Sequence, residues 1–178
     1  RYHVIQWVHR STRGWSYGAS ITDPRTGEII KGHVSLGSLR IRQDFLIAQA
    51  LLDQPFENND TNNAPMLEMA LARIRQLAAH EVGHTLGLRH NFKGSSIYSI
   101  EQLSDPNFTK ENGISGSVMD YQPINVFNGK TFFQTRPGVY DIWAIEYAYK
   151  QPNRSDSEEK FLEKIASKST DPLLRYGT

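Results

Sequence analysis

The sequence predicts an α+β fold, in which a small sheet comes first and helices follow. Three observations predict it. The first 36 residues are rich in β-branched and aromatic residues, the middle of the chain carries a long stretch with a helical apolar period, and further helical stretches lie beyond residue 139. Strands gathered before helices are typical of α+β proteins, whereas a parallel α/β sheet would alternate the two.

Three strands are expected in the N-terminal part, over residues 2–9, 16–22 and 28–36. The last two are joined by the sequence Asp-Pro-Arg-Thr-Gly at residues 23–27. Proline presets one backbone angle of a turn and glycine supplies a positive φ, so this joint predicts a hairpin.

Two helices are expected after the strands. Apolar residues recur at helical spacing over residues 39–53. A second helix begins at Ala64, with Asn62 or Asn63 as its cap and a proline near its first position. Residues 57–63 form a polar loop by composition. The second helix runs for about 23 residues, or about 35 Å, and is a rigid platform for a site.

The C-terminal half is less regular. One helical turn is expected at residues 99–103 and a hairpin turn at 127–130. An aromatic helix is expected at 140–150, a linker at 151–157 and a charged amphipathic helix at 157–168. Asp156 or Ser157 would cap the last helix. The long polar connection that ends at residue 118 is expected to wall one side of a cleft, with Tyr98 or Phe108 as a substrate contact.

Length, charge and composition exclude several classes of protein. A chain of 178 residues corresponds to one domain, expected over residues 1–178. Lys and Arg number 20 against 19 Asp and Glu, so neither nucleic acid nor an anionic membrane is expected as a partner. No window approaches the ~18 apolar residues of a membrane-spanning helix. Cysteine is absent, so a metal must be held by nitrogen and oxygen ligands.

Residues 80–90, His-Glu-Val-Gly-His-Thr-Leu-Gly-Leu-Arg-His, carry the strongest functional signal. On a helix, His80 and His84 lie one turn apart on the same face, so both rings can reach one metal ion. Gly87 can adopt a positive φ, end the helix and bring His90 to the metal as a third ligand. Three protein ligands leave one tetrahedral position for water, which is the arrangement of a catalytic zinc site.

Glu81 lies about 100° around the helix from His80, near the metal without having to ligate it. The implied reaction is hydrolysis of a peptide bond, in which zinc activates a water molecule and Glu81 takes its proton as general base. Alternatively, Glu81 only orients a histidine. By chance, the full spacing H-E-x-x-H-x-x-G-x-x-H arises about three times in a hundred thousand chains of this composition, so scattered surface histidines explain it poorly.

This motif resembles that of the metzincin zinc endopeptidases, whose second hallmark is a downstream Met-turn. Met119, within Ser-Val-Met-Asp-Tyr at residues 117–121, resembles the Met-turn methionine, which in that clan forms an apolar floor beneath the three histidines. Tyr121 resembles a tyrosine of the astacin-like and serralysin-like branches. That likeness implies a residue that stabilises the transition state, and the alternative is a packed aromatic side chain.

The resemblance implies a metzincin-like catalytic domain with a small twisted sheet, a long active-site helix, a Met-turn and C-terminal helices. It also implies zinc as the cofactor and a protein or peptide as the substrate. In metzincins an edge strand of the sheet pairs with the substrate backbone. We expect Ile29–Leu36 to be that strand, with Gly32, His33 and Val34 as substrate-binding residues; the alternative is an interior strand without a substrate role.

Longer segments, at residues 7–44, 90–95, 117–123 and 140–147, resemble a family of large, poorly characterised bacterial zinc-dependent metalloproteases. The chain begins at Arg1, without an initiator methionine or a signal peptide. We therefore expect a fragment of a longer secreted, periplasmic or cell-surface protein, whose other domains are its partners. Asn91 stands where better-known branches carry aspartate, glutamate or proline, so their specificity does not carry over.

Two other functions compete with peptide hydrolysis by a metzincin. A metal-bound but inactive module could use the cleft to hold a protein partner, although such modules typically lose the general base, and Glu81 is present. In a gluzincin, a downstream glutamate replaces His90 as the third ligand. Glu101 and Glu111 are the nearest candidates, and neither lies in a clear second helix.

Overall fold

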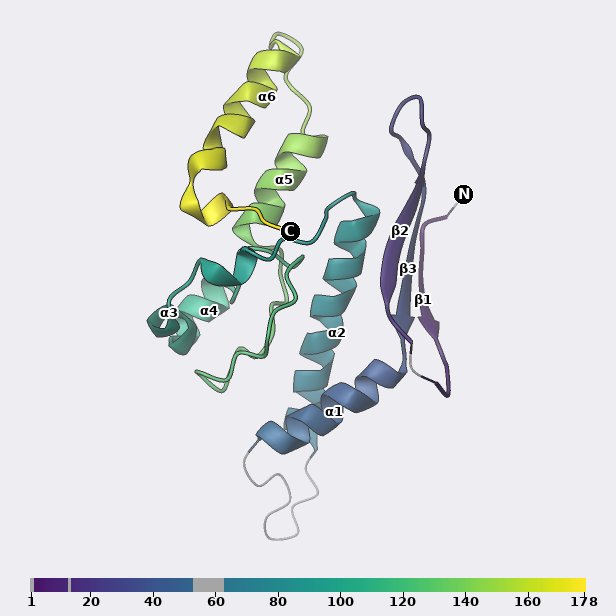
Figure 1. Ribbon diagram of the computed structural model, residues 1–178, viewed down its shortest axis with the longest axis vertical. Coiled ribbons are helices and arrows are strands. Elements are labelled where there is room, and N and C mark those ends of the chain that lie inside the picture. Colours follow the sequence, from purple (N-terminus) through teal and green to yellow (C-terminus); the bar gives the residue numbers. More distant parts are fainter. Residues whose placement is uncertain (1, 13, 53–62) are drawn as a thin grey trace. The chain divides into compact units, whose positions relative to one another are not determined.

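The computed structural model describes residues 2–12, 14–52 and 63–178. The chain divides into two compact units, one ending at Gly87 and the other running from Leu88 to Thr178. The first unit contains strands β1 to β3 and helices α1 and α2, and the second contains helices α3 to α6 (Figure 1). Strands and helices are thus segregated along the chain, which confirms the predicted α+β class.

The three predicted strands form one mixed sheet in the first unit. They are β1 (Val4–Val8), β2 (Tyr17–Thr22) and β3 (Ile29–Gly37), and their order in the sheet is β1-β3-β2. The predicted hairpin joins β2 to β3. The N–H of Asp23 donates to the carbonyl of Glu28 over 2.9 Å, and Gly27 has a φ of 75°.

The prediction that Ile29–Leu36 is an edge strand is wrong. Strand β3 lies in the centre of the sheet, where His33 pairs with Val4 of the parallel β1 and with Ala19 of the antiparallel β2. Both edges of β3 are therefore engaged within the sheet. Gly32, His33 and Val34 have no open strand edge on which a peptide could pair, and Val34 is buried in the core.

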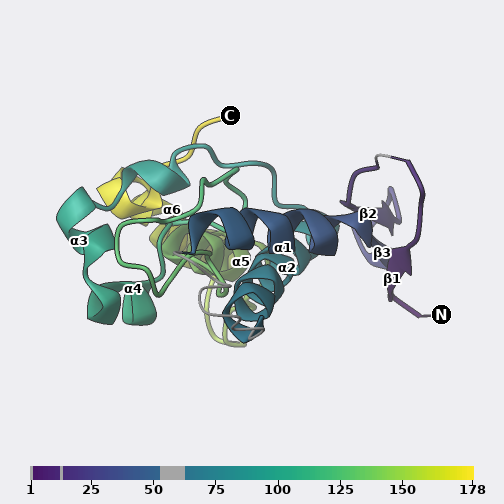
Figure 2. The same cartoon turned by 90° about the horizontal axis from the view of Figure 1, so that it is seen from below.

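Helices α1 (Leu39–Leu51) and α2 (Ala64–Thr85) follow the sheet where they were predicted. Helix α2 packs against β2 and β3. Helix α1 crosses α2 near the N-terminal end of α2 (Figure 1), and Figure 2 shows the same pair from below. The buried apolar side chains of this unit come from β3 and from both helices: Val34, Leu36, Ala48, Met66, Met69 and Ala70. Asn63 precedes α2 without a side-chain capping bond, and the predicted loop before it lies outside the described residues.

Strand β2 approaches α2 unusually closely at Gly18. A Cβ added to Gly18 would lie 1.9 Å from the carbonyl oxygen of Glu81, which is a main-chain atom that cannot turn away. Only glycine fits where two backbones approach this closely. Gly18 therefore sets the distance between the sheet and the helix that carries the histidine motif.

The second unit contains more helix than predicted. A single turn was expected at residues 99–103, but two short helices occur, α3 (Ile100–Ser104) and α4 (Pro106–Asn112). Each has its own cap: the Ser99 hydroxyl accepts from the Gln102 N–H, and the Asp105 carboxylate accepts from the Asn107 N–H. Short helices of this kind depend on such caps, because four orphan N–H groups at each start need partners.

The hairpin predicted at residues 127–130 is also wrong. Gly129 does take a positive φ of 63°, but no strands flank this turn in the described part of the chain. Instead, the Asn128 side chain closes the turn by accepting from the N–H groups of Lys130 and Thr131. The turn chemistry was recognised correctly, whereas the strands on either side of it were not.

The last two helices, α5 (Val139–Tyr149) and α6 (Glu158–Ala166), lie where they were predicted. Short 3₁₀ turns at Ser167–Thr170 and Pro172–Leu174 follow α6. The indole N–H of Trp143 on α5 donates to the carbonyl of Ile165 on α6 over 2.8 Å. Among the described residues, no helix is long and apolar enough to cross a bilayer.

Replacing Gly18 with alanine should destabilise the protein, because the new Cβ would overlap the main chain of α2. Overpacking of this kind typically costs about 1–3 kcal/mol. Gly37→Ala is the matched control in the same sheet, since its Cβ would meet nothing within 4 Å. Urea unfolding measures both variants. A Gly18→Ala protein as stable as Gly37→Ala would show that β2 and α2 do not pack this closely.

Candidate metal centre and catalytic site

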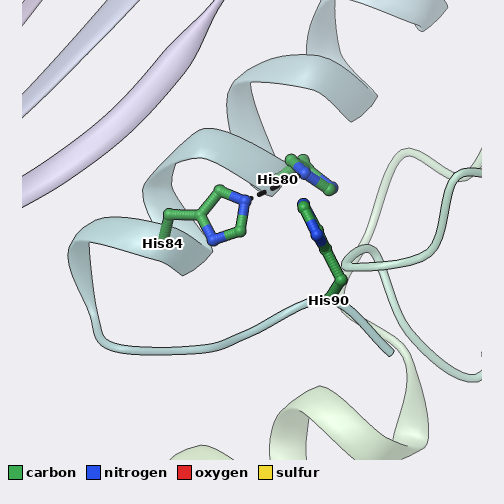
Figure 3. Close-up of side chains that lie close together, drawn as sticks. All are labelled: His80, His84 and His90. Atoms are coloured by element: carbon green, nitrogen blue, oxygen red, sulfur yellow. Dashed lines mark hydrogen bonds between the residues drawn. The ribbon is translucent and has the colours of Figure 1, made fainter. Parts of the chain in front are cut away.

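His80 and His84 project from one face of α2, one turn apart (Figure 3). Their Nε2 atoms are 3.2 Å apart, and their rings are almost perpendicular, with centroids separated by 4.7 Å. His80 is buried and His84 is half-buried. The i, i+4 spacing of the helix thus brings two imidazole nitrogens to one point, as the sequence predicted.

Helix α2 ends just after His84, at Thr85. Gly87 follows with a φ of 91°, and its N–H donates to the carbonyl of His84 over 3.0 Å. A Cβ on Gly87 would meet nothing within 4 Å, so the backbone conformation, and not the space, calls for glycine. The predicted helix end at Gly87 is therefore present.

His90 completes a group of three imidazoles after this turn. One ligand atom from each of His80, His84 and His90 lies within 4.8 Å of the others, and Figure 3 shows the rings directed toward one another. The eleven-residue motif therefore brings together the three side chains that the sequence marked as metal ligands.

The geometry of this group fits a metal ion. Two nitrogen ligands on tetrahedral zinc, each at 2.0–2.1 Å, are separated by roughly 3.3 Å. The Nε2 atoms of His80 and His84 are 3.2 Å apart. Three imidazoles form a donor set that suits zinc.

Glu81 lies beside His80 and is only 5% exposed. Burial raises the pKa of its carboxyl above the usual value, while the nearby His84, a hydrogen bond from the Gly18 N–H and the charge of Arg73 each act in the opposite direction. The Glu81 carboxylate thus lies in a largely desolvated place. The sequence analysis missed Gly18, although a glycine inside a strand signals a close backbone approach.

Met119 is fully buried in the loop that follows α4. This loop is held by the side chain of Asp141, in the first turn of α5. Its carboxylate accepts from the Ser117 hydroxyl over 2.6 Å, from the Val118 N–H over 2.7 Å and from the Gly138 N–H over 2.8 Å. The Ser117 oxygen in turn accepts from the Met119 N–H over 3.0 Å.

Asp141 is therefore the anchor of the methionine loop, and the sequence analysis did not identify it. Burial raises the pKa of the Asp141 carboxyl, although its three donors favour the charged form. The close packing continues next to it, since a Cβ on Gly138 would lie 2.1 Å from the carbonyl oxygen of Gly116. An acidic residue in the first turn of the predicted helix was the available signal, because such a side chain can cap the helix start.

Tyr121 is 67% exposed, so it does not belong to the buried core of its unit. Its ring centroid lies 4.5 Å from that of His90 and 5.6 Å from that of Phe92, which is also exposed. The structure therefore places Tyr121 beside the third histidine, on the surface of its unit.

The remaining candidates do not belong to the three-histidine group. Glu101 and Glu111 are exposed on α3 and α4, and the group of possible metal ligands among the described residues does not include them. Tyr98 and Phe108 pack against each other edge to face, with centroids 5.0 Å apart. His33 packs edge to face against Tyr17.

A mixed sheet, a long helix with two histidines, a glycine turn to a third histidine and a buried methionine loop together define a metzincin-type domain. Comparison with known families makes this specific: the family described as Met-zincin matches residues 62–178, and the chain belongs to it. The match contains α2, the three histidines and Met119. Family membership and the three-histidine group together make zinc the metal that the site implies.

A curated relative agrees with this assignment. The chain is 28% identical over 113 residues to matrix metalloproteinase-21 of Xenopus laevis. The similarity covers 63% of this chain but only 17% of that protein. No solved structure is significantly similar to the chain.

Replacing Asp141 with asparagine should loosen the methionine loop. The amide group of asparagine keeps one acceptor oxygen and turns a donor toward groups that are themselves donors, so a buried N–H or hydroxyl loses its partner. The expected loss is about 1–3 kcal/mol of unfolding free energy. Asp105→Asn is the control, because asparagine caps a helix as well as aspartate does. Equal thermal stability of the two variants would contradict the anchoring role of Asp141.

Proposed function

We propose that this domain is a zinc-dependent endopeptidase. The observation that carries the proposal is the group formed by His80, His84 and His90, with the buried carboxylate of Glu81 beside it on the same helix. Membership of the Met-zincin family and similarity to a matrix metalloproteinase support it. Three histidine ligands with a fourth position open are typical of catalytic zinc sites and not of structural ones.

In this proposal the three histidines hold zinc, which supplies Lewis-acid activation of a water molecule and of the scissile carbonyl. Glu81 accepts the proton of the attacking water and passes it to the leaving amine. The Tyr121 hydroxyl donates a hydrogen bond to the oxyanion that develops at the scissile carbonyl. Met119 supplies the apolar floor of the site.

We propose β2 as the strand that receives the substrate backbone. Among the described residues β2 pairs with β3 alone, so its other edge is open, in contrast to β3. That strand also carries Gly18, which lies against the backbone of Glu81 on α2. A peptide that adds to an open edge gains backbone hydrogen bonds whatever its sequence, and an endopeptidase needs this kind of recognition.

We also propose what kind of protein contains this domain. We infer a catalytic domain over residues 1–178 with a linker at 151–157, within a longer secreted, periplasmic or cell-surface bacterial protein. The support is the likeness of residues 7–44, 90–95, 117–123 and 140–147 to large bacterial metalloproteases. The curated relative, which is much longer than its matching part, is compatible with further domains.

Glu81→Gln should reduce hydrolysis at least about 100-fold while zinc stays bound, because a neutral amide cannot take a proton from water. Cleavage of a mixed peptide library, read by mass spectrometry, measures the loss. Glu68→Gln is the matched control, since Glu68 is an exposed glutamate on the same helix. If the wild-type zinc protein cleaves nothing, the domain is instead an inactive metal-bound interaction module.

His90→Ala should weaken zinc binding strongly, because it removes a ligand. The loss should exceed the roughly 10–100-fold seen when a residue that only hydrogen-bonds to a ligand is removed. A chelator competition titration measures the affinity. His9→Ala is the control, because His9 is an exposed histidine that is absent from the metal-ligand group. Unchanged zinc affinity in His90→Ala would favour a glutamate such as Glu101 or Glu111 as the third ligand.

A further inference from the structure

Asn91, the residue directly after the third histidine, is fully buried and bonded on several sides. Its main-chain N–H donates to the carbonyl of Met119 over 3.1 Å. Its side-chain amide donates to the carbonyl of Arg175 over 2.9 Å. Its side-chain oxygen accepts from the N–H of Gly177 over 3.1 Å and from the N–H of Lys93 over 3.2 Å.

Residues 175–177 are held against this position by further contacts. The N–H of Phe92 donates to the carbonyl of Gly177 over 2.8 Å. The ring of Tyr176 stacks on that of Tyr140 on α5, with centroids 5.8 Å apart and planes inclined by 20°. One main-chain bond and two bonds to the Asn91 side chain thus hold this segment beside residues 91–93, and an aromatic contact joins it to α5.

The chemistry of these bonds requires asparagine. Its side chain is a donor at one end and an acceptor at the other, and both ends are used. Aspartate would keep the acceptor and lose the donor, and an apolar residue would lose both. Each buried backbone group that loses its partner destabilises the folded state. The Asn91 side chain therefore donates one hydrogen bond and accepts others, and no aspartate, glutamate or proline at this position could make the same set of bonds.

We propose that Asn91 is the positioning residue for His90, and that residues 175–177 are part of the support of the metal centre. This inference rests on the proposed function, because it takes His90 to be a zinc ligand. The peptide unit that follows His90 is fixed by the Met119 carbonyl, and the next residues are fixed by residues 175–177. His90 lies beyond the end of α2, so these bonds do for the third ligand what the helix does for the first two.

The test compares zinc affinity with folding stability in the full chain. Asn91→Ala should weaken zinc binding at least about 10-fold, as loss of an outer-shell partner does. Asn91→Asp keeps the acceptor bonds to Lys93 and Gly177 and should lose less affinity. Asn112→Ala, which removes an exposed asparagine from α4, should leave zinc affinity unchanged. Chelator competition measures affinity, and thermal unfolding of the metal-free proteins measures stability.

A purely structural role would lower the melting temperature of Asn91→Ala while its folded protein binds zinc as tightly as wild type, and that result would overturn the inference. If Asn91→Ala does not fold, Asn91→Asp decides in the same way: weakened zinc binding supports the inference and wild-type binding overturns it. A wild-type protein that binds no zinc would overturn the proposed function together with this inference. If the wild-type protein binds zinc and both Asn91 variants bind it as tightly as wild type, this inference alone is overturned.

Discussion

The close approach of two imidazole nitrogens on one turn of α2 is the interaction on which the rest of this structure depends. At 3.2 Å, the Nε2 atoms of His80 and His84 either share a proton or face a common cation. The helix sets this distance by its own geometry, provided that it does not bend or shift. Its first half is accordingly buried through Met66 and Met69, and its last turns lie so close to β2 that Gly18 can carry no side chain.

The parts of the site outside α2 have no helix or sheet to hold them, and buried polar side chains do this instead. Asp141 accepts three hydrogen bonds from the loop around Met119 and from the start of its own helix, and Asn91 joins the residues after His90 to residues 175–177. Buried loop backbone must find partners for its N–H and carbonyl groups, and one branched polar side chain can serve several of them. The stability of these loops is therefore sensitive to substitution of such a side chain, because its loss leaves several buried groups without partners.

The features that the sequence predicted are those encoded within one or two turns of chain. The histidine spacing, the glycine that ends α2 and the apolar period of α1, α2, α5 and α6 are local patterns, and the structure contains them. The features that were missed join distant residues. Turn chemistry showed that β2 and β3 pair, but β3 has a second neighbour in β1, 29 residues away at Val4 and His33. The hydrogen bond between Asn91 and Gly177 joins residues 86 positions apart, and no local sequence pattern predicts it.

The central position of β3 also changes how substrate recognition and proton transfer are related. Had β3 been the edge, the substrate strand and the general base would have been separate requirements on the sheet and on the helix. With β2 at the edge, the proposed substrate strand is also the strand whose Gly18 lies against the backbone of Glu81. In the proposed function, a peptide that pairs with the open edge of β2 extends a sheet that packs against α2, the helix that carries the base. In the proposed function, residue 18 therefore affects both the strand that receives the substrate and the packing of that strand on α2, whereas the main chain of His33 is paired on both sides within the sheet.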